Sequence, residues 1–532
     1  MAEEKEEKSM LYKLKPVTGR LPAVTRPEGH VHFRTKMMWL ILILVLYFAM
    51  TNIMIYGLDT TTGVDLFAQY RAILAGAQFS LMHLGIGPIV TGSIIMQLFT
   101  GAKIIKLNLK DDEDKAVYQG TQKLLVIIMI WVEAVPQVFG FMEPSARFTS
   151  TLTGVVGGGF LMSPEGWARF IIVLQLFVGS YLVFLMDEVV SKWGIGSGIS
   201  LFIAAGVAQQ IFTGTLNWHP SNPEAAISLE NAPAGTIPKT IYLFHNLSAS
   251  QLANGGYERM FLLQPNPLVA LIGTVVIFLF VAYTESSRIE LPLAHGGARG
   301  ARGRYPIKLI YASNIPVILM AALLANVSMF ALLFYNNGGF QGVPILGQNP
   351  MLGYYPPGAT KPAAGLAYYL SSISGFGDWL LPLLSGSYLD SYNTGLGLDK
   401  SKLQIGIHVL VYVGVMIIGS VLFARFWIET TNMGPEAVAS QIESSGMQIP
   451  GFRRDPRVLK RVLERYIPVV TVISGATVGA LAAGADLIGT VGNASGTGVL
   501  LAVGIMIQLY DAMGREQMME MHPVLRGFFG GE

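Results

Sequence analysis

The chain has 532 residues, of which 52% are hydrophobic and only 13% are charged, so it is poorer in charge than soluble domains, which carry about 25% charged residues. Its net charge of +2 gives no bulk electrostatic case for binding nucleic acid or an acidic substrate. Cysteine is absent, which excludes disulfides, thiolate metal sites, iron–sulfur clusters and a cysteine nucleophile.

The chain begins with a polar, charged tail over residues 1–36, and the first apolar run follows it. No small-residue cleavage site stands where a signal peptidase would need one. We therefore expect this run to be a retained membrane helix, with a long signal peptide as the alternative.

Ten apolar runs are candidates for membrane helices. A bilayer core of ~30 Å needs about 20 apolar residues in a helix, and backbone groups in lipid must be paired within the segment. The runs are Met37–Tyr56, Leu81–Ile105, Leu124–Phe141, Phe170–Val190, Ile199–Phe212, Leu268–Tyr283, Leu309–Tyr335, Ile405–Trp427, Ile467–Leu487 and Val499–Met513. The fifth, sixth and tenth are short, so we expect those helices to extend into their polar flanks.

Charge between the runs predicts the topology. Eight of the 36 Lys and Arg residues fall in alternate segments on one side: Arg71, Arg147, Arg169, Lys239, Arg259, Lys361, Lys400 and Lys402. The other 28 fall on the opposite side, which by the positive-inside rule is cytoplasmic. Ten helices with both termini cytoplasmic account for this bias, and a miscount by one helix would scramble it.

The loops divide the chain further. We expect a first half over 37–212, an external loop over 213–267 and a second half over 268–513, then a cytoplasmic tail over 514–532. The second half includes another external loop over 336–402 and a cytoplasmic loop over 425–466. Both external loops are rich in Gly, Pro and Asn, which predicts small ordered caps. The segment Gly57–Ser80 is too polar to span and too apolar for a free linker, so we expect it to be buried inside the protein or folded back from the outer side.

Four polar residues lie within the spans: Thr91, Gln97, Glu133 and Asn326. Polar groups in a membrane are costly and usually face protein or water. Each is either part of an ordinary interhelical hydrogen bond or part of a functional site.

Enzyme signatures are missing from the sequence. It has no G-x-x-x-x-G-K-[ST], no H-E-x-x-H and no G-x-S-x-G, and its eight histidines do not cluster at metal-ligand spacing. We expect no catalytic residue, no metal and no cofactor, so the energy for any transport must come from a partner or a gradient.

Several sequence words occur in order with this topology. They are LGIGPIVT (84–91), IIMQ (94–97), YQGTQKLL (118–125), DEVVSKWGIGSGI (187–199), LFIAAG (201–206), IELPLAH (289–295), YPIK (305–308), SNIPVI (313–318) and RYIP (465–468). Together they resemble the SecY family of protein-conducting channels, in its archaeal and eukaryotic branch. The match runs from the first helix to the C-terminal tail.

The resemblance implies an all-α membrane fold in which helices one to five and six to ten form two inverted halves around an hourglass pore. A ring of apolar side chains would close the waist and bar ions. Matching motif to motif places the ring on Ile86, Val90, Ile199, Ile203, Ile318 and Leu501. The first four form two pairs spaced i,i+4, so each pair lies on one helix face.

The resemblance also implies a plug over about residues 60–74 and a lateral gate between the second and third helices and the seventh and eighth. Thr91, Gln97, Glu133 and Asn326 are candidate contacts across that gate. Basic residues in the cytoplasmic loops are candidates for ribosome docking: Arg299, Arg302, Arg304, Arg453 and Arg454. Topology determination and anionic-lipid contact are the alternative for these arginines.

The implied function is the central pore subunit of the Sec translocon in the cell membrane. It would pass unfolded, signal-bearing polypeptides across the membrane and release transmembrane segments into lipid. The implied partners are the SecE/gamma and beta small subunits, the ribosome with its nascent chain, signal sequences and membrane lipid. A secondary transporter is the alternative, but it would need charged or ion-coordinating groups at the midplane, where this waist is apolar. A membrane-embedded enzyme has no catalytic constellation in its favour.

Overall fold

The computed structural model describes residues 10–59, 71, 74–101, 104–105, 107, 111–156, 163–222, 225–263, 265–295, 302–308, 314–336, 349–356, 361–396, 400–431, 433–444, 447–448, 456–492 and 494–521. Within these ranges, nine helices are long and apolar enough to cross a membrane. A tenth, α3, is apolar but has only 15 residues. The ten are α2 (Phe33–Thr51), α3 (Gly87–Gly101), α4 (Asp112–Phe141), α6 (Pro164–Trp193), α7 (Gly198–Leu216), α11 (Leu268–Ser286), α12 (Ile315–Asn336), α16 (Lys402–Thr430), α18 (Pro456–Ile488) and α19 (Gly496–Met521).

These helices correspond one to one with the ten predicted spans. As expected, the fifth, sixth and tenth (α7, α11 and α19) extend beyond their apolar runs. The second is shorter than predicted, because α3 begins at Gly87 rather than near residue 81. Gly85 has a φ of +55°. The backbone of Leu74 lies so close to it that a Cβ on residue 85 would be 2.1 Å from the Leu74 carbonyl oxygen. The chain therefore turns at Gly85. Pro88 is the second residue of α3, in the first turn, where a missing N–H removes no hydrogen bond from the helix.

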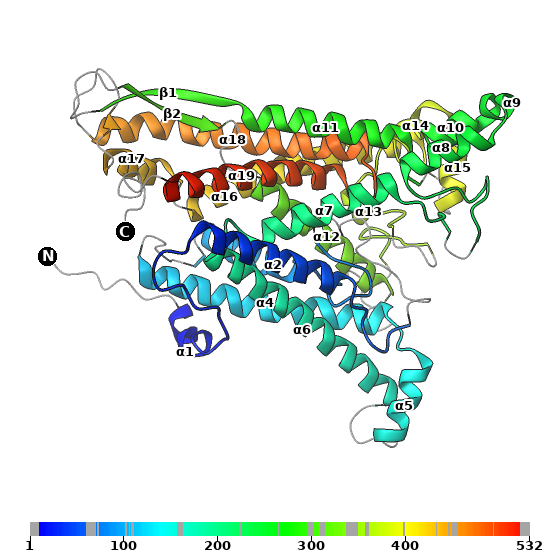
Figure 1. The fold of residues 1–532 in the computed structure, drawn as a ribbon, viewed down its shortest axis with the longest axis horizontal. Helices are drawn as coiled ribbons and strands as arrows, with labels where there is room; N and C mark the ends of the chain where they lie inside the picture. The colour runs from blue at the N-terminus through cyan, green and yellow to red at the C-terminus, as the bar shows by residue number, and fades with distance from the viewer. Residues whose placement is uncertain are drawn as a thin grey trace.

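The long helices lie side by side in two groups (Figure 1). The first five form the lower group in that view, and most of the second five lie above them. Within the first group α4 contacts both α3 and α6, and α7 contacts α6 and α2. Within the second group α16 packs against α12 and α18, and α19 packs against α11 and α18. This arrangement agrees with two five-helix halves.

Both halves use the same device to start their last helix. In the first half the backbone N–H of Ile199, the second residue of α7, donates to Asp187 Oδ1 at 2.9 Å. In the second half the N–H of Thr497, the second residue of α19, donates to Asp486 Oδ1 at 2.9 Å. A carboxylate at a helix N-terminus pairs free N–H groups and complements the helix dipole. The repeated device supports a structural repeat that the sequence alone does not display.

The two ends of the helix bundle differ in structure. One end carries short helices in the segments that connect the long helices (Figure 1). They are α5 (Ala146–Val156), α8 (Thr236–Asn246), α9 (Ala249–Gln251), a π-helical turn (Leu252–Gly256), α10 (Tyr257–Phe261), α13 (Leu366–Leu370), α14 (Leu380–Leu384) and α15 (Gly386–Leu396). The opposite end carries a 3-10 turn (Met10–Leu14), α1 (Lys15–Thr18), α17 (Pro435–Ser444) and the strands β1 (Arg288–His295), β2 (Arg302–Lys308) and β3 (Met447–Gln448).

The strands form a small antiparallel sheet in the order β2-β1-β3. In the β1–β2 pair Arg288 stands opposite Lys308, and Ala294 opposite Arg302. β3 pairs with the end of β1, where Ala294 stands opposite Gln448. The predicted all-α fold therefore holds for the membrane part, while two connecting segments predicted as loops, after α11 and after α16, add this sheet.

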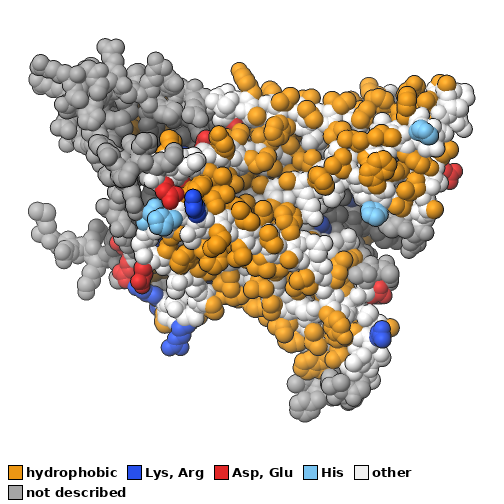
Figure 2. All heavy atoms as spheres, viewed as in Figure 1, with side chains coloured by type: hydrophobic (Ala, Val, Ile, Leu, Met, Phe, Trp, Pro, Cys, Tyr) orange, Lys and Arg blue, Asp and Glu red, His pale blue; other side chains and the backbone are white. Residues whose placement is uncertain are grey.

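Apolar side chains cover the long helices in a broad band, and most charged side chains lie at its two ends (Figure 2). On α11, for example, Ile272, Val275 and Leu279 are all more than half exposed. Such a surface is stable against lipid and would be unfavourable against water. The exposed band thus fits a membrane, as the composition predicts.

Candidate functional site

Five of the six predicted ring residues lie on four helices of both halves, and Ile86 directly precedes α3. Five of them, Ile86, Val90, Ile203, Ile318 and Leu501, are at most 5% exposed and belong to one continuous apolar core. The sixth, Ile199, is partly buried and packs against that core.

The four helices that carry the ring follow one another in space. α3 contacts α12, α12 contacts α19, and α19 contacts α7. Ile86 itself stands just before α3, where its N–H donates to the Leu74 carbonyl at 2.8 Å and its own carbonyl accepts from Val90 at 3.0 Å. The structure therefore brings the six positions onto helices that meet in one core, in which both halves take part.

Three of the four polar candidates form one hydrogen-bonded chain across the two halves. Asn326 Nδ2, on α12, donates to Thr91 Oγ1, on α3, at 2.8 Å. The Thr91 hydroxyl lies 2.9 Å from Glu133 Oε1, on α4, and 2.8 Å from the Gly87 carbonyl, and it can donate to either. Glu133 is fully buried. We call Asn326, Thr91 and Glu133 the polar latch.

Gln97 stands apart from the polar latch. It is buried on α3 six residues beyond Thr91, about 9 Å along the helix. Within the described part of the chain its side-chain oxygen has no hydrogen-bond partner.

Sequence reasoning missed a second polar link between the same helices. Gln137, one turn beyond Glu133 on α4, donates through Nε2 to Met329 Sδ on α12 at 3.6 Å. Its Oε1 lies 3.1 Å from His83 Nε2. Gln137 and His83 are both buried, and the spacing of Gln137 four residues after Glu133 could have indicated a shared face.

The segment between α2 and α3 folds back, as expected, in its described parts. Ile55 N–H donates to the Phe79 carbonyl, and Leu81 N–H to the Ile53 carbonyl, both at 2.9 Å. Tyr47 of α2 donates its hydroxyl to the Ala75 carbonyl at 3.1 Å. Most of the predicted plug, residues 60–70 and 72–73, lies outside the described residues.

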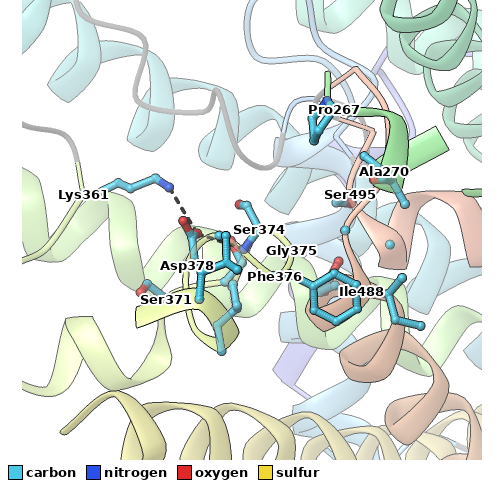
Figure 3. Close-up of a pocket in the computed structure, with 18 of the residues that line it drawn as sticks. Pro267, Ala270, Lys361, Ser371, Ser374, Gly375, Phe376, Asp378, Ile488 and Ser495 are labelled. Carbon is cyan, nitrogen blue, oxygen red and sulfur yellow. Dashed lines mark hydrogen bonds and ion pairs between the residues drawn. The ribbon is translucent and has the colours of Figure 1, made fainter. Parts of the chain in front are cut away.

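A pocket of about 380 Å³ lies at the end of the bundle that carries the short helices (Figure 3). Its lining includes Ser495 and Gly496, which precede Leu501 by about 8 Å along α19. Lys361 points toward Asp378 there, with 3.6 Å between the charged atoms, and Asp378 also accepts the Ser374 N–H at 3.0 Å. Charged and polar side chains therefore lie beside apolar ones in the lining of this pocket.

Two of the five predicted docking residues lie at the opposite end. Arg302 and Arg304 are in β2, in register with Ala294 and Pro292 of β1. Arg299, Arg453 and Arg454 lie outside the described residues.

Comparison with known proteins matches two family models. The SecY model matches residues 80–510, and the model of the plug domain of Sec61p matches residues 45–78. A protein translocase subunit SecY from Archaeoglobus fulgidus is 45% identical over 525 residues, which cover 98% of this chain and 99% of the relative.

Solved structures agree with this fold. The structure of a protein conducting channel matches with a TM-score of 0.71 and 37% identity, covering 96% of this chain and 98% of the other. Sec61 in the canine ribosome–channel complex from the endoplasmic reticulum matches with a TM-score of 0.68, 37% identity and the same coverage. The chain therefore belongs to the SecY family of protein translocase subunits.

Proposed function

We propose that this chain is the central pore-forming subunit of a Sec translocon, through which unfolded, signal-bearing polypeptides cross the membrane between its two halves. The observation that carries this proposal is the apolar core formed jointly by α3, α7, α12 and α19. Its six ring residues include no ionisable side chain. An apolar constriction can part around a polypeptide and exclude ions by dewetting, whereas a secondary transporter needs charged or ion-coordinating groups there.

The lateral gate lies between α3 and α4 on one side and α12 and α16 on the other. Contacts of α12 with both α3 and α4, and of α16 with α3, support a closed gate in this structure. The polar latch and the Gln137–Met329 pair bridge this boundary. A signal sequence or transmembrane segment that inserts between α3 and α12 would replace the latch contacts and reach lipid.

Both termini are cytoplasmic in this proposal, and the membrane is the cell membrane. The charge bias of the loops supports the orientation. Lys36, at the start of α2, forms an ion pair with Glu516 near the end of α19 at 2.7 Å, so the two ends of the membrane domain share one side. The basic strand β2 lies at that same side (Figure 1).

The partners are the ribosome with its nascent chain and the two small subunits, SecE/gamma and beta. A ribosome complex of the similar canine channel supports the first. Arg302 and Arg304 on β2, together with Arg299, Arg453 and Arg454, would contact ribosomal RNA, because guanidinium groups bind phosphate well. The chain itself is a passive channel without catalytic activity or cofactor, so its partners supply the driving force.

Reconstitution tests the proposal directly. The chain, purified with its small subunits and placed in liposomes, should bind ribosomes that carry a signal-bearing nascent chain and render that chain resistant to external protease. The matched control is the same nascent chain without its signal, which should remain sensitive. If neither ribosome binding nor signal-dependent protection appeared, the proposed function would be wrong.

A further inference from the structure

Helix α8 lies in the segment between α7 and α11 and has a buried face and an exposed apolar face. Thr236, Lys239 and Leu243 are buried against the protein, and Leu243 belongs to a small core with Met260. On the other face Ile237, Ile241 and Phe244 are 38%, 53% and 64% exposed. Their i, i+4, i+7 spacing forms one stripe along the helix. An unpartnered apolar stripe of this kind is costly on a water-facing helix.

No charged group lies on that exposed stripe. Lys239 is the only Lys, Arg, Asp or Glu in α8. Its side chain is only 5% exposed, and its ammonium group donates to the carbonyls of Leu263 at 2.7 Å and Pro265 at 3.0 Å. The only Lys, Arg, Asp or Glu of the helix is thus turned inward and hydrogen-bonded, while His245 is exposed beside the stripe in the last turn.

The position of α8 along the membrane normal follows from its two attachments. At its start, the Gly235 N–H donates to the carbonyl of Asn217, the residue after α7, at 2.9 Å. Thr236 Oγ1 bonds the Gly214 carbonyl at 3.3 Å. On its inner face the Lys239 bonds reach the segment just before α11. Since α7 ends and α11 begins at the same membrane surface, α8 lies at the boundary between lipid and water.

Neighbouring side chains mark the same boundary. Trp218, two residues beyond the end of α7, is 59% exposed, and tryptophan gathers at membrane interfaces. Phe212 and Leu216 continue the exposed apolar surface of α7 toward α8, and α8 also contacts α11. An apolar groove of about 510 Å³ runs between α7, α11 and α19. The α8 stripe is therefore next to helices whose exposed side chains are apolar like its own.

We propose that α8 is an interfacial helix whose stripe of Ile237, Ile241 and Phe244 is seated in the acyl chains of the outer leaflet. Its occupant is lipid rather than a protein, because three side chains fall short of the ~800 Å² per partner of a stable protein interface. Amphipathic helices bind membranes in this way, with their apolar face about 5–10 Å into the headgroup and acyl boundary. The assignment to the outer leaflet rests on the proposed orientation of the chain, whereas the contact of α8 with lipid does not.

Contact of the α8 stripe with lipid would hold the connection between the two halves at a fixed depth in the membrane. α7 is the last helix of the first half, and α11 is the first of the second. Because α8 is bonded to the end of one and to the segment before the other, a lipid-anchored α8 keeps that connection at the membrane surface while the opposite side opens.

The accessibility of nitroxide spin labels on α8 to oxygen and to a nickel chelate tests the proposed contact with lipid. Labels attach only to introduced cysteines, because the chain has no cysteine of its own. Ile241→Cys and Phe244→Cys would each be labelled in the full complex with cysteine-free small subunits, in vesicles of phosphatidylcholine and phosphatidylglycerol. Two controls match them. Ile272→Cys lies on the span α11 and is 53% exposed, as is Ile241, and Ser250→Cys lies exposed on α9.

Collision of each label with oxygen, which concentrates in lipid, is compared with collision with a water-soluble nickel chelate. The proposal predicts an oxygen-to-nickel ratio at both α8 positions several-fold above that at Ser250 and approaching that at Ile272. A ratio equal to that at Ser250 would place the stripe in water and overturn the proposal. A label shielded from both reagents would show a protein partner on the stripe and overturn it equally. Ribosome binding by the labelled complexes is measured alongside, so that loss of channel function is seen separately.

Discussion

Replacing Thr91 by Val should make the lateral gate open more easily. The two side chains are nearly the same size, so the change removes the hydroxyl and little else. The Thr91 hydroxyl accepts from Asn326 across the two halves and lies within bonding distance of Glu133. Without it Asn326 loses its contact across the gate, and the buried Glu133 loses a contact within its own half.

Only the Asn326–Thr91 bond crosses the gate, because Thr91 and Glu133 lie on α3 and α4 of the same half. Side-chain hydrogen bonds between membrane helices average about 0.6 kcal/mol and reach about 1.7 kcal/mol. Losing this bond should therefore destabilise the closed gate by about 0.6–1.7 kcal/mol, which raises the open-to-closed ratio about 3- to 18-fold. If signal sequences bind the open gate, the apparent Kd of a signal peptide should fall by the same factor while the open state is rare.

Titration of a fluorescent signal peptide into the complex in nanodiscs measures this Kd. Ser93→Ala is the matched control, because the Ser93 hydroxyl is also on α3 but accepts from Gln122 of α4 at 2.7 Å, within one half. Asn326→Leu should act like Thr91→Val, and the double variant should change the free energy by less than the sum of the two. Equal Kd values for Thr91→Val and Ser93→Ala would refute the role of the polar latch.

Three further predictions concern the seal, the packing and the external cap. Replacing Ile86 and Val90 by Ser should make resting liposomes leak ions, whereas Ser at a lipid-facing isoleucine of α11 should not; an unchanged conductance contradicts the ring. Gly496→Ala places a Cβ 2.0 Å from a backbone carbon and should lower the melting temperature sharply, whereas Gly484→Ala has open space and should leave it unchanged or raise it slightly; equal melting would count against the close approach. Burial lowers the pKa of Lys239 from 10.5 to about 8, so the unfolded chain holds that proton more tightly and stability should rise between about pH 8 and 10.5. Lys239→Met should flatten that rise in thermal melts, and a slope that persists would refute the assignment.

The number of spans was predictable because hydropathy and loop charge constrain it twice. A wrong count would have moved basic residues such as Lys308 and Arg425 to the opposite side. The start of α3 was not predictable from hydropathy, since residues 81–86 are as apolar as the helix. Only the close approach of Leu74 to Gly85 shows why the chain turns there.

The small sheet was missed for a different reason. The segments that become β1 and β2 are short and interrupted by Pro292 and Pro306, which weakens any strand signal. The pairing of β1 with β2, and with β3 more than a hundred residues away, depends on tertiary structure.

The candidate site was predictable by residue but not by partner. The cost of burying polar groups drew attention to Thr91, Glu133 and Asn326 one at a time. That Asn326 meets Thr91, 235 residues away, and that Gln97 does not join them, became visible only with the packing of α3 against α12.

A polypeptide that passes through the ring formed by four helices must contact the side chains of that ring. Photocrosslinking residues are placed singly at Ile203, Ile318 and Leu501, in complexes that hold a stalled, half-translocated chain. We expect crosslinks to the stalled chain from all three positions and none from Ile272, which is exposed on α11. Crosslinks from Ile272 without any from the three ring positions would contradict passage through the ring.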